Sequence, residues 1–106
     1  YPDVLWPIEY RTVAADNVWL SPARERATVT VSIHEDVERD ETAYYKDAET
    51  VFRAHGGRPH WGKVHYLSGE DLAADYDHWQ DWWRVRDEVD PTGVLLNDAL
   101  RKLRTS

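Results

Sequence analysis

The chain has 106 residues, of which 13 are lysine or arginine and 20 are aspartate or glutamate, so its formal net charge at pH 7 is −7. This length suits one domain with a modest core. The acidic balance repels phosphate backbones and anionic lipid surfaces, so we expect no nucleic-acid partner. With no cysteine and no apolar run near the roughly 20 residues of a membrane helix, neither disulfides nor a transmembrane segment are expected.

The start of the chain, Tyr1-Pro2-Asp3, runs directly into a strand-like stretch rather than a signal-like segment. We therefore expect a cytoplasmic location, with membrane association left open. The chain contains no methionine, which suggests a fragment, although removal of an initiator methionine explains this equally well.

A first strand is predicted from Val4 to Ala14, where β-branched and aromatic residues alternate with polar ones. Its alternation places Glu9 and Arg11 on one face and Tyr10 on the other. The charged ends of Glu9 and Arg11 can meet and can point at whatever lies over that face. A surface salt bridge is the simpler interpretation, because such pairs are common and contribute little to stability.

A second strand is predicted from Ala27 to His34, after a loop with turn residues at 16–24. Three aliphatic side chains are expected to face the core: Val29, Val31 and Ile33. Thr30, Ser32 and His34 then line the opposite side. Ser32 and His34 form a second polar pair, and two such pairs on neighbouring strands suggest a lined cavity, although antiparallel sheets often have a solvated face.

A helical period begins at Asp40 and continues to His55, and Gly56 provides the stop. The segment from Gly56 to Lys63 then combines three glycines, a proline, His60 and Trp61 in eight residues. Such a constrained, extended segment is more typical of a site than of a core. Val64 to Leu67 is predicted to continue as a third strand.

Lys63 is a candidate site residue only if other charged groups lie close to it. If it lies partly buried near Arg11, desolvation and the like charge both favour the neutral amine, which can accept or share a proton. Taken alone it is more simply an exposed lysine, since buried lysines are rare. Trp61 is the one tryptophan that we expect to contact a cofactor or substrate.

Three further helices are predicted: one from Ser68 to Tyr76 with a capping-box start, one from about His78 to Val89, and one from Asn97 to Leu103. The spacing of Trp79, Trp82 and Trp83 suits a core-facing stripe better than a carbohydrate platform. The five histidines lack metal-ligand spacing, so no metal site is expected.

Several of these motifs resemble those of a known family. The strand Pro7-Ile8-Glu9-Tyr10-Arg11 and the loop Trp19-Leu20-Ser21-Pro22 are similar to its E-x-R strand and D-x-x-L-S loop, and residues 58–63 (RPHWGK) to its R-P-H-W-G-K motif. Residues 90–97 look like its closing D-P-x-G-x-F-x-N segment. The chain thus resembles the C-terminal part of the FAD-linked sugar-1,4-lactone oxidases (L-gulono- and D-arabinono-1,4-lactone oxidase) and alditol oxidase, within the vanillyl-alcohol-oxidase type of flavoproteins.

The resemblance implies a role for each matching residue. Catalytic contacts fall to Lys63, Glu9 and Arg11, with Glu9 and Arg11 on the substrate hydroxyls and Lys63 on the reacting oxygen. Ser32 and His34 are implied substrate ligands, and His34 favours the lactone branch. The implied contacts to FAD are His60, Trp61 and Asn97. Tyr10 and Val94-Leu95 depart from the family pattern without touching this polar set.

The resemblance also implies an α+β fold, an antiparallel sheet covered by helices. Residues 1–106 would form a single C-terminal substrate (cap) domain, or part of one, that oxidises a hydroxyl of an aldono-1,4-lactone by hydride transfer to FAD. The FAD-binding domain of the family lies N-terminal to this part, and no comparable segment occurs here, so we expect the chain to need that domain as a partner and to be inactive alone. An alditol (polyol) oxidase fragment and a free-standing, non-catalytic module of the same fold remain as alternatives.

Overall fold

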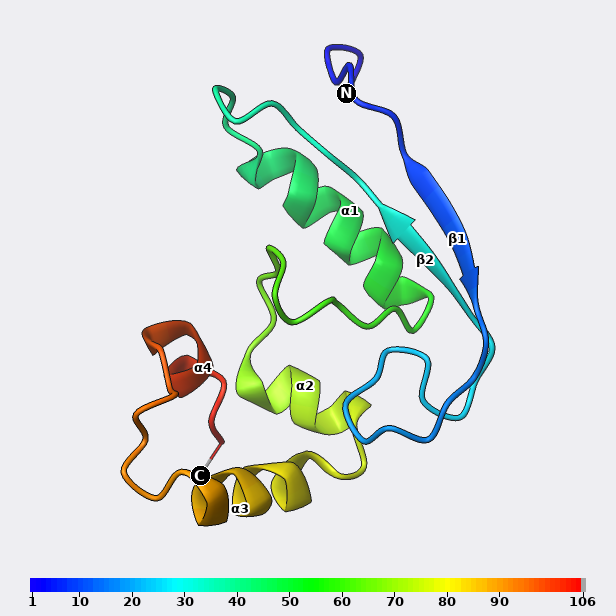
Figure 1. The fold of residues 1–106 in the computed structure, drawn as a ribbon. Helices are drawn as coiled ribbons and strands as arrows, with labels where there is room; N and C mark the ends of the chain where they lie inside the picture. Colours follow the sequence, from blue (N-terminus) through cyan, green and yellow to red (C-terminus); the bar gives the residue numbers. More distant parts are fainter. Residues whose placement is uncertain (106) are drawn as a thin grey trace. The chain divides into compact units, whose positions relative to one another are not determined.

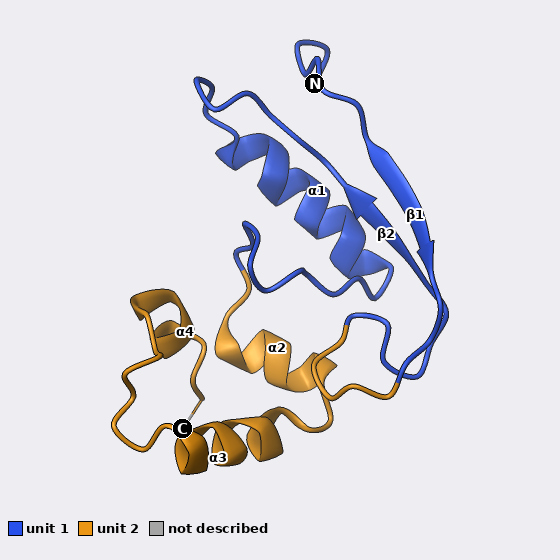
Figure 2. Cartoon of the chain, viewed as in Figure 1, with its two compact units in different colours: residues 1–16, 22–66 blue, residues 17–21, 67–106 orange. Residues whose placement is uncertain are grey.

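The computed structural model describes residues 1–105 and combines two strands with four helices (Figure 1). In chain order these are β1 (Glu9–Val13), β2 (Thr28–Ser32), α1 (Thr42–Ala54), α2 (Gly69–Asp75), α3 (Trp79–Val89) and α4 (Asp98–Lys102). The α+β class is therefore confirmed. The chain divides into two compact units, the first made of residues 1–16 and 22–66 and the second of 17–21 and the residues from 67 onward (Figure 2).

The first unit contains an antiparallel ribbon made of β1 and β2, both shorter than predicted. In its register Glu9 lies opposite Ser32 and Arg11 opposite Thr30. Residues directly opposite each other on paired strands project from the same face. The ribbon therefore has one polar face, which we define by Glu9, Arg11, Thr30 and Ser32.

The other face of the ribbon is apolar and open, which corrects one prediction. Val29 and Val31 were expected to face the core, but they are 42% and 38% exposed, and Tyr10 opposite Val31 is 69% exposed. Every residue of β1 is exposed as well, so within residues 1–105 no helical layer covers this face. The alternation of side chains was correct, but the first unit supplies no apolar surface to bury them.

Helix α1 begins and ends on local signals. The Oδ1 of Asp40 accepts a hydrogen bond from the amide of Thr42 (2.9 Å), and this bond lowers the pKa of Asp40. At the other end Gly56 has φ +68°, its amide donates to the carbonyl of Arg53 (3.0 Å), and the Gly57 amide donates to that of Phe52 (2.8 Å). This is the left-handed helix termination that glycine favours, so the predicted stop is confirmed.

The predicted third strand at Val64–Leu67 is wrong, because none of these residues belongs to a strand. The amide of Tyr66 instead donates to the Oε2 of Glu49 on α1 (2.9 Å), and the Lys46 ammonium lies 5.1 Å from the centre of the Tyr66 ring. A side-chain carboxylate on a helix thus takes the place that a neighbouring strand would have filled.

The second unit holds most of the buried side chains of the described chain. Helix α2 starts with a capping box, in which the Ser68 hydroxyl accepts from the Asp71 amide and the Asp71 carboxylate from the Ser68 amide, as predicted. The buried hydrophobic residues of this unit are Leu72, Tyr76, Trp79, Trp83 and Leu103. The Trp79 and Trp83 rings meet edge to face with their centroids 6.1 Å apart, so the core-facing stripe is confirmed for these two residues, whereas Trp82 is half-buried.

The turn after α3 is organised by Asp90, which is 9% exposed. Its carboxylate accepts hydrogen bonds from the amides of Val94 (3.0 Å) and Leu95 (2.9 Å) and pairs with Arg86. The Leu95 bond is the main reason why the pKa of Asp90 is lowered.

Across residues 1–105, no helix is both long and apolar enough to cross a membrane.

Candidate functional site

The polar face of the ribbon is centred on a charged pair. The Nη2 of Arg11 donates to the Oε2 of Glu9 at 2.8 Å, while the two side chains remain 69% and 44% exposed. Both the strand spacing and the ion pair fix the direction of the guanidinium. Because neither side chain is buried in a core, the pair is available to a ligand.

His34 continues the polar face beyond the end of β2. The register that places Glu9 opposite Ser32 would, if extended by two residues on each strand, place Pro7 opposite His34. The Nδ1 of His34 does lie 3.2 Å from the carbonyl oxygen of Pro7. The imidazole therefore bonds to the main chain across the ribbon, and continued alternation after Ser32 would place it on the side of Ser32 and Glu9.

Lys63 lies at the end of a tight turn that its own motif builds. The Lys63 amide donates to the carbonyl of His60 (3.0 Å), and the Gly62 amide donates to the Nδ1 of the same histidine (3.0 Å). The Lys63 residue is exposed, and no carboxylate among residues 1–105 pairs with its ammonium. The burial that would favour a neutral amine is therefore not provided by this chain itself.

The three residues expected to contact FAD lie in both units. Since the Nδ1 of His60 accepts from an amide, its neutral ring carries the proton on Nε2 and offers a hydrogen-bond donor. Trp61 is half-buried beside it. Asn97 belongs to the second unit, where its Oδ1 accepts from the Leu100 amide (2.8 Å) and caps α4, which leaves its side-chain NH₂ as a donor. Donors of this kind suit the carbonyl and ring-nitrogen acceptors of a flavin, so the chemistry of each residue, taken in its own unit, fits the group.

The structure thus brings four of the predicted residues onto one ribbon face: Glu9, Arg11, Ser32 and His34. Two contributors were not among the candidate ligands. Thr30 was placed on this face by alternation with Ser32 and His34, and it lies opposite Arg11. The carbonyl of Pro7 holds His34, and only the strand register reveals that contact.

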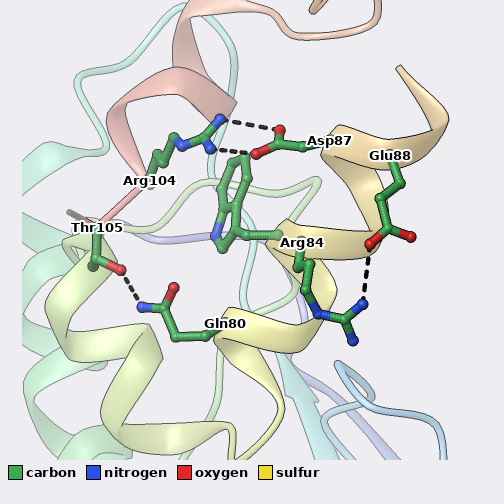
Figure 3. A pocket seen from close by; sticks show the side chains of 7 residues that line it. Gln80, Arg84, Asp87, Glu88, Arg104 and Thr105 are labelled. Atoms are coloured by element: carbon green, nitrogen blue, oxygen red, sulfur yellow. Dashed lines mark hydrogen bonds and ion pairs between the residues drawn. The ribbon is translucent and has the colours of Figure 1, made fainter. Parts of the chain in front are cut away.

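A surface hollow in the second unit contains none of the predicted site residues (Figure 3). Its rim carries charged groups that neutralise one another: Arg104 pairs with Asp87, and Arg84 with Glu88 at 3.1 Å. The Gln80 amide also donates to the Thr105 hydroxyl (2.8 Å). The hollow therefore offers a ligand few charged groups that are not already paired.

In the part of the chain that is described, no group of three or more histidine, cysteine, aspartate or glutamate residues could hold a metal ion.

The sequence relatives of this chain are oxidoreductases. It is 36% identical to an L-gulono-1,4-lactone dehydrogenase of Mycobacterium tuberculosis over 94% of its length, and 34% identical to an L-gulonolactone oxidase of Bos taurus over 92%. An alditol oxidase of a Streptomyces species is 38% identical over 94% of the chain. These names define a class of enzymes that act on sugar lactones and alditols.

Residues 2–103 match the model of the D-arabinono-1,4-lactone oxidase family, and the chain belongs to this family. The resemblance seen in the motifs is thereby confirmed. The chain spans 23% of the length of the lactone relatives and 24% of the alditol oxidase, and the match falls in their C-terminal part.

Proposed function

We propose that this chain forms the substrate side of the active site in an FAD-dependent oxidase or dehydrogenase that oxidises a hydroxyl of an aldono-1,4-lactone. The observation that carries the proposal is the polar face of the ribbon, where the Glu9–Arg11 pair, Ser32 and His34 gather in a member of a lactone oxidase family. Residues 1–106 would act as a C-terminal substrate domain, or part of one. The FAD-binding domain would come from the same polypeptide or from a second chain.

The charges of the site suit alcohol oxidation. Loss of the hydroxyl proton places negative charge on the oxygen, and departure of hydride from the alcohol carbon then converts this oxygen into that of the carbonyl. Arg11, held by Glu9 at 2.8 Å, and the exposed ammonium of Lys63 are the cations that would stabilise this oxygen. The second carboxylate oxygen of Glu9 would accept a hydrogen bond from a neighbouring hydroxyl and so orient the ring.

A bound flavin would supply the redox chemistry by accepting the hydride. In the first unit His60 would donate a hydrogen bond to an acceptor atom of the flavin, and Trp61 would pack against it. In the second unit the side-chain amide of Asn97 is a donor of the same kind. The family supports this assignment, since its members are FAD-dependent oxidases. The chain alone is expected to show no activity, because the residues proposed to touch FAD are few and contain no phosphate-binding segment.

An alditol is the second candidate substrate. The Streptomyces alditol oxidase is 38% identical to the chain, and Ser32 beside His34 could bind an open polyol as readily as a ring. The lactone is preferred because the family model and several relatives carry lactone names. A free-standing module without catalysis is the remaining alternative.

The test is to produce the chain together with the FAD-binding domain and to measure oxygen or dye reduction with L-gulono-1,4-lactone, D-arabinono-1,4-lactone and a linear alditol. Lys63→Ala is expected to lower turnover strongly at unchanged flavin content. Lys102→Ala, an exposed lysine on α4, is the matched control and should leave turnover unchanged. Full turnover in Lys63→Ala would remove the role assigned to this lysine, and no turnover of any substrate by the flavin-loaded wild type would favour the non-catalytic module.

A further inference from the structure

We propose that the Nε2 atom of His34 is the acceptor of the substrate hydroxyl proton. This inference rests on the proposed function and assigns to one atom a step that the residue roles above leave open. It begins with the hydrogen bond between the Nδ1 of His34 and the Pro7 carbonyl, which measures 3.2 Å. A carbonyl oxygen only accepts hydrogen bonds, so the hydrogen must be on Nδ1. The neutral ring then carries its lone pair on Nε2.

The other polar groups of the candidate site are less suited to accept a proton. Arg11 remains protonated in proteins, and the Oε2 of Glu9 is already engaged by that guanidinium. The exposed ammonium of Lys63 has no lone pair until it loses a proton. His34 therefore offers a neutral nitrogen acceptor on the polar face.

Three of the other histidines differ from His34 in tautomer or in position. The Nδ1 of His60 accepts from the Gly62 amide (3.0 Å), so its Nε2 is a donor and cannot accept a proton in the neutral ring. His55 bonds to the Val51 carbonyl (2.9 Å) at the end of α1, and His78 bonds to Asp81 (2.9 Å) in the second unit. The main chain thus sets opposite tautomers in the two histidines of the candidate site, an acceptor at His34 and a donor at His60.

The step balances in atoms and electrons. The O–H bond of the substrate breaks and its proton goes to the Nε2 of His34, while the C–H bond breaks and its hydrogen leaves with both electrons as hydride to the flavin. The oxygen electron pair forms the carbonyl. His34 then becomes an imidazolium that still donates from Nδ1 to the Pro7 carbonyl, and the carboxylate of Glu9, two residues after Pro7 in the sequence, lies on the polar face to offset its charge.

Charged residues stand on the facing strand and next to His34 in the sequence. Glu9 and Arg11 belong to the facing strand. Glu35, next in the chain, has a side chain that is 6% exposed and lies 3.8 Å from the Nε of Arg39. Glu9 and Glu35 thus each have an arginine partner.

The experiment uses the flavin-loaded protein assembled from both domains and compares wild type with His34→Gln. Glutamine can still hydrogen-bond but cannot accept a proton at neutral pH. We expect kcat/KM to fall by about 10²- to 10⁴-fold, the KM to change little, and the acid-side limb of the wild-type pH profile to disappear. His55→Gln, an exposed histidine with the same tautomer, should keep the wild-type profile.

Two further readings make the result decisive. Long-range ¹H–¹⁵N NMR of the assembled protein at neutral pH should show the proton of His34 on Nδ1, and a proton on Nε2 would overturn the inference without any activity measurement. Lactone oxidation by wild type with an unchanged acid limb in His34→Gln would overturn this inference and leave the proposed function intact. Absence of oxidation in the flavin-loaded wild type would overturn both.

Discussion

Replacement of Arg11 by methionine tests whether this arginine contributes mainly to stability or mainly to substrate binding. The side chain is 69% exposed, and its ion pair with Glu9 spans 2.8 Å. In a medium with the dielectric constant of water, Coulomb's law gives about 1.5 kcal/mol for two unit charges at this distance. Salt screening and the cost of ordering two long side chains reduce such exposed pairs to below about 1 kcal/mol.

The effect of Arg11→Met on activity should be much larger. A hydrogen bond between a guanidinium and a charged oxygen in a shielded site contributes about 1.5–3 kcal/mol. If Arg11 stabilises the reacting oxygen, its loss lowers kcat/KM for the lactone by about 10- to 150-fold. The stability of the variant should differ from wild type by no more than about 1 kcal/mol.

The assay combines urea unfolding with lactone-dependent dye reduction by the assembled, flavin-loaded protein. Arg84→Met is the matched control, since Arg84 is 60% exposed and pairs with Glu88 at 3.1 Å in the second unit. It should cost as little stability as Arg11→Met and leave kcat/KM unchanged. The reasoning is refuted if Arg11→Met loses more than about 2 kcal/mol of stability, or if it keeps the wild-type kcat/KM.

Two predictions concern the second unit. A Cβ added at Gly69 would lie 2.2 Å from the carbonyl oxygen of Leu103, whereas a normal contact measures about 3.3 Å. Gly69→Ala should therefore lower the free energy of unfolding by about 1–3 kcal/mol, although alanine is the better helix former. Gly62→Ala, whose Cβ would meet only the His60 ring at 3.3 Å, is the control for urea unfolding, and an equal stability of both variants would contradict the contact. Arg104 lowers the pKa of Asp87 by hydrogen bonding. This carboxylate therefore stabilises the fold above the ordinary aspartate pKa of about 3.9. The stabilisation is lost as the pH falls through the lower pKa that Asp87 has in the folded protein. Asp87→Asn should therefore flatten the decrease of stability below about pH 4, and acid titrations of both proteins that run parallel would argue against the pairing.

The sequence predicted those features of the fold and of the candidate site that depend on a few neighbouring residues. The capping box at Ser68 and the stop at Gly56 are set by a few neighbouring residues, and both were correct. The Trp79 and Trp83 stripe was also correct, because its helical period is strong and the side chains are large. The residues of the polar face followed from alternation, while the cross-strand contact of His34 with Pro7 required the register.

The errors arose where a distant partner decides the outcome. Alternation showed that Val29 and Val31 share a face, but it could not show that nothing in residues 1–105 covers that face. Val64–Leu67 has the composition of a strand, yet Glu49 on α1 takes the amide of Tyr66 that a strand would have used. Both outcomes depend on tertiary contacts that local propensity does not contain.

The central claim is that the polar face of the ribbon binds the substrate whose hydride reduces the flavin. The most direct measurement is stopped-flow absorbance of the flavin in the assembled protein, mixed anaerobically with L-gulono-1,4-lactone. The wild type is expected to bleach in a lactone-dependent manner. The double variant Glu9→Gln/Arg11→Met, at equal flavin content, should bleach at least about tenfold more slowly. Equal rates of bleaching in the two proteins would contradict the claim.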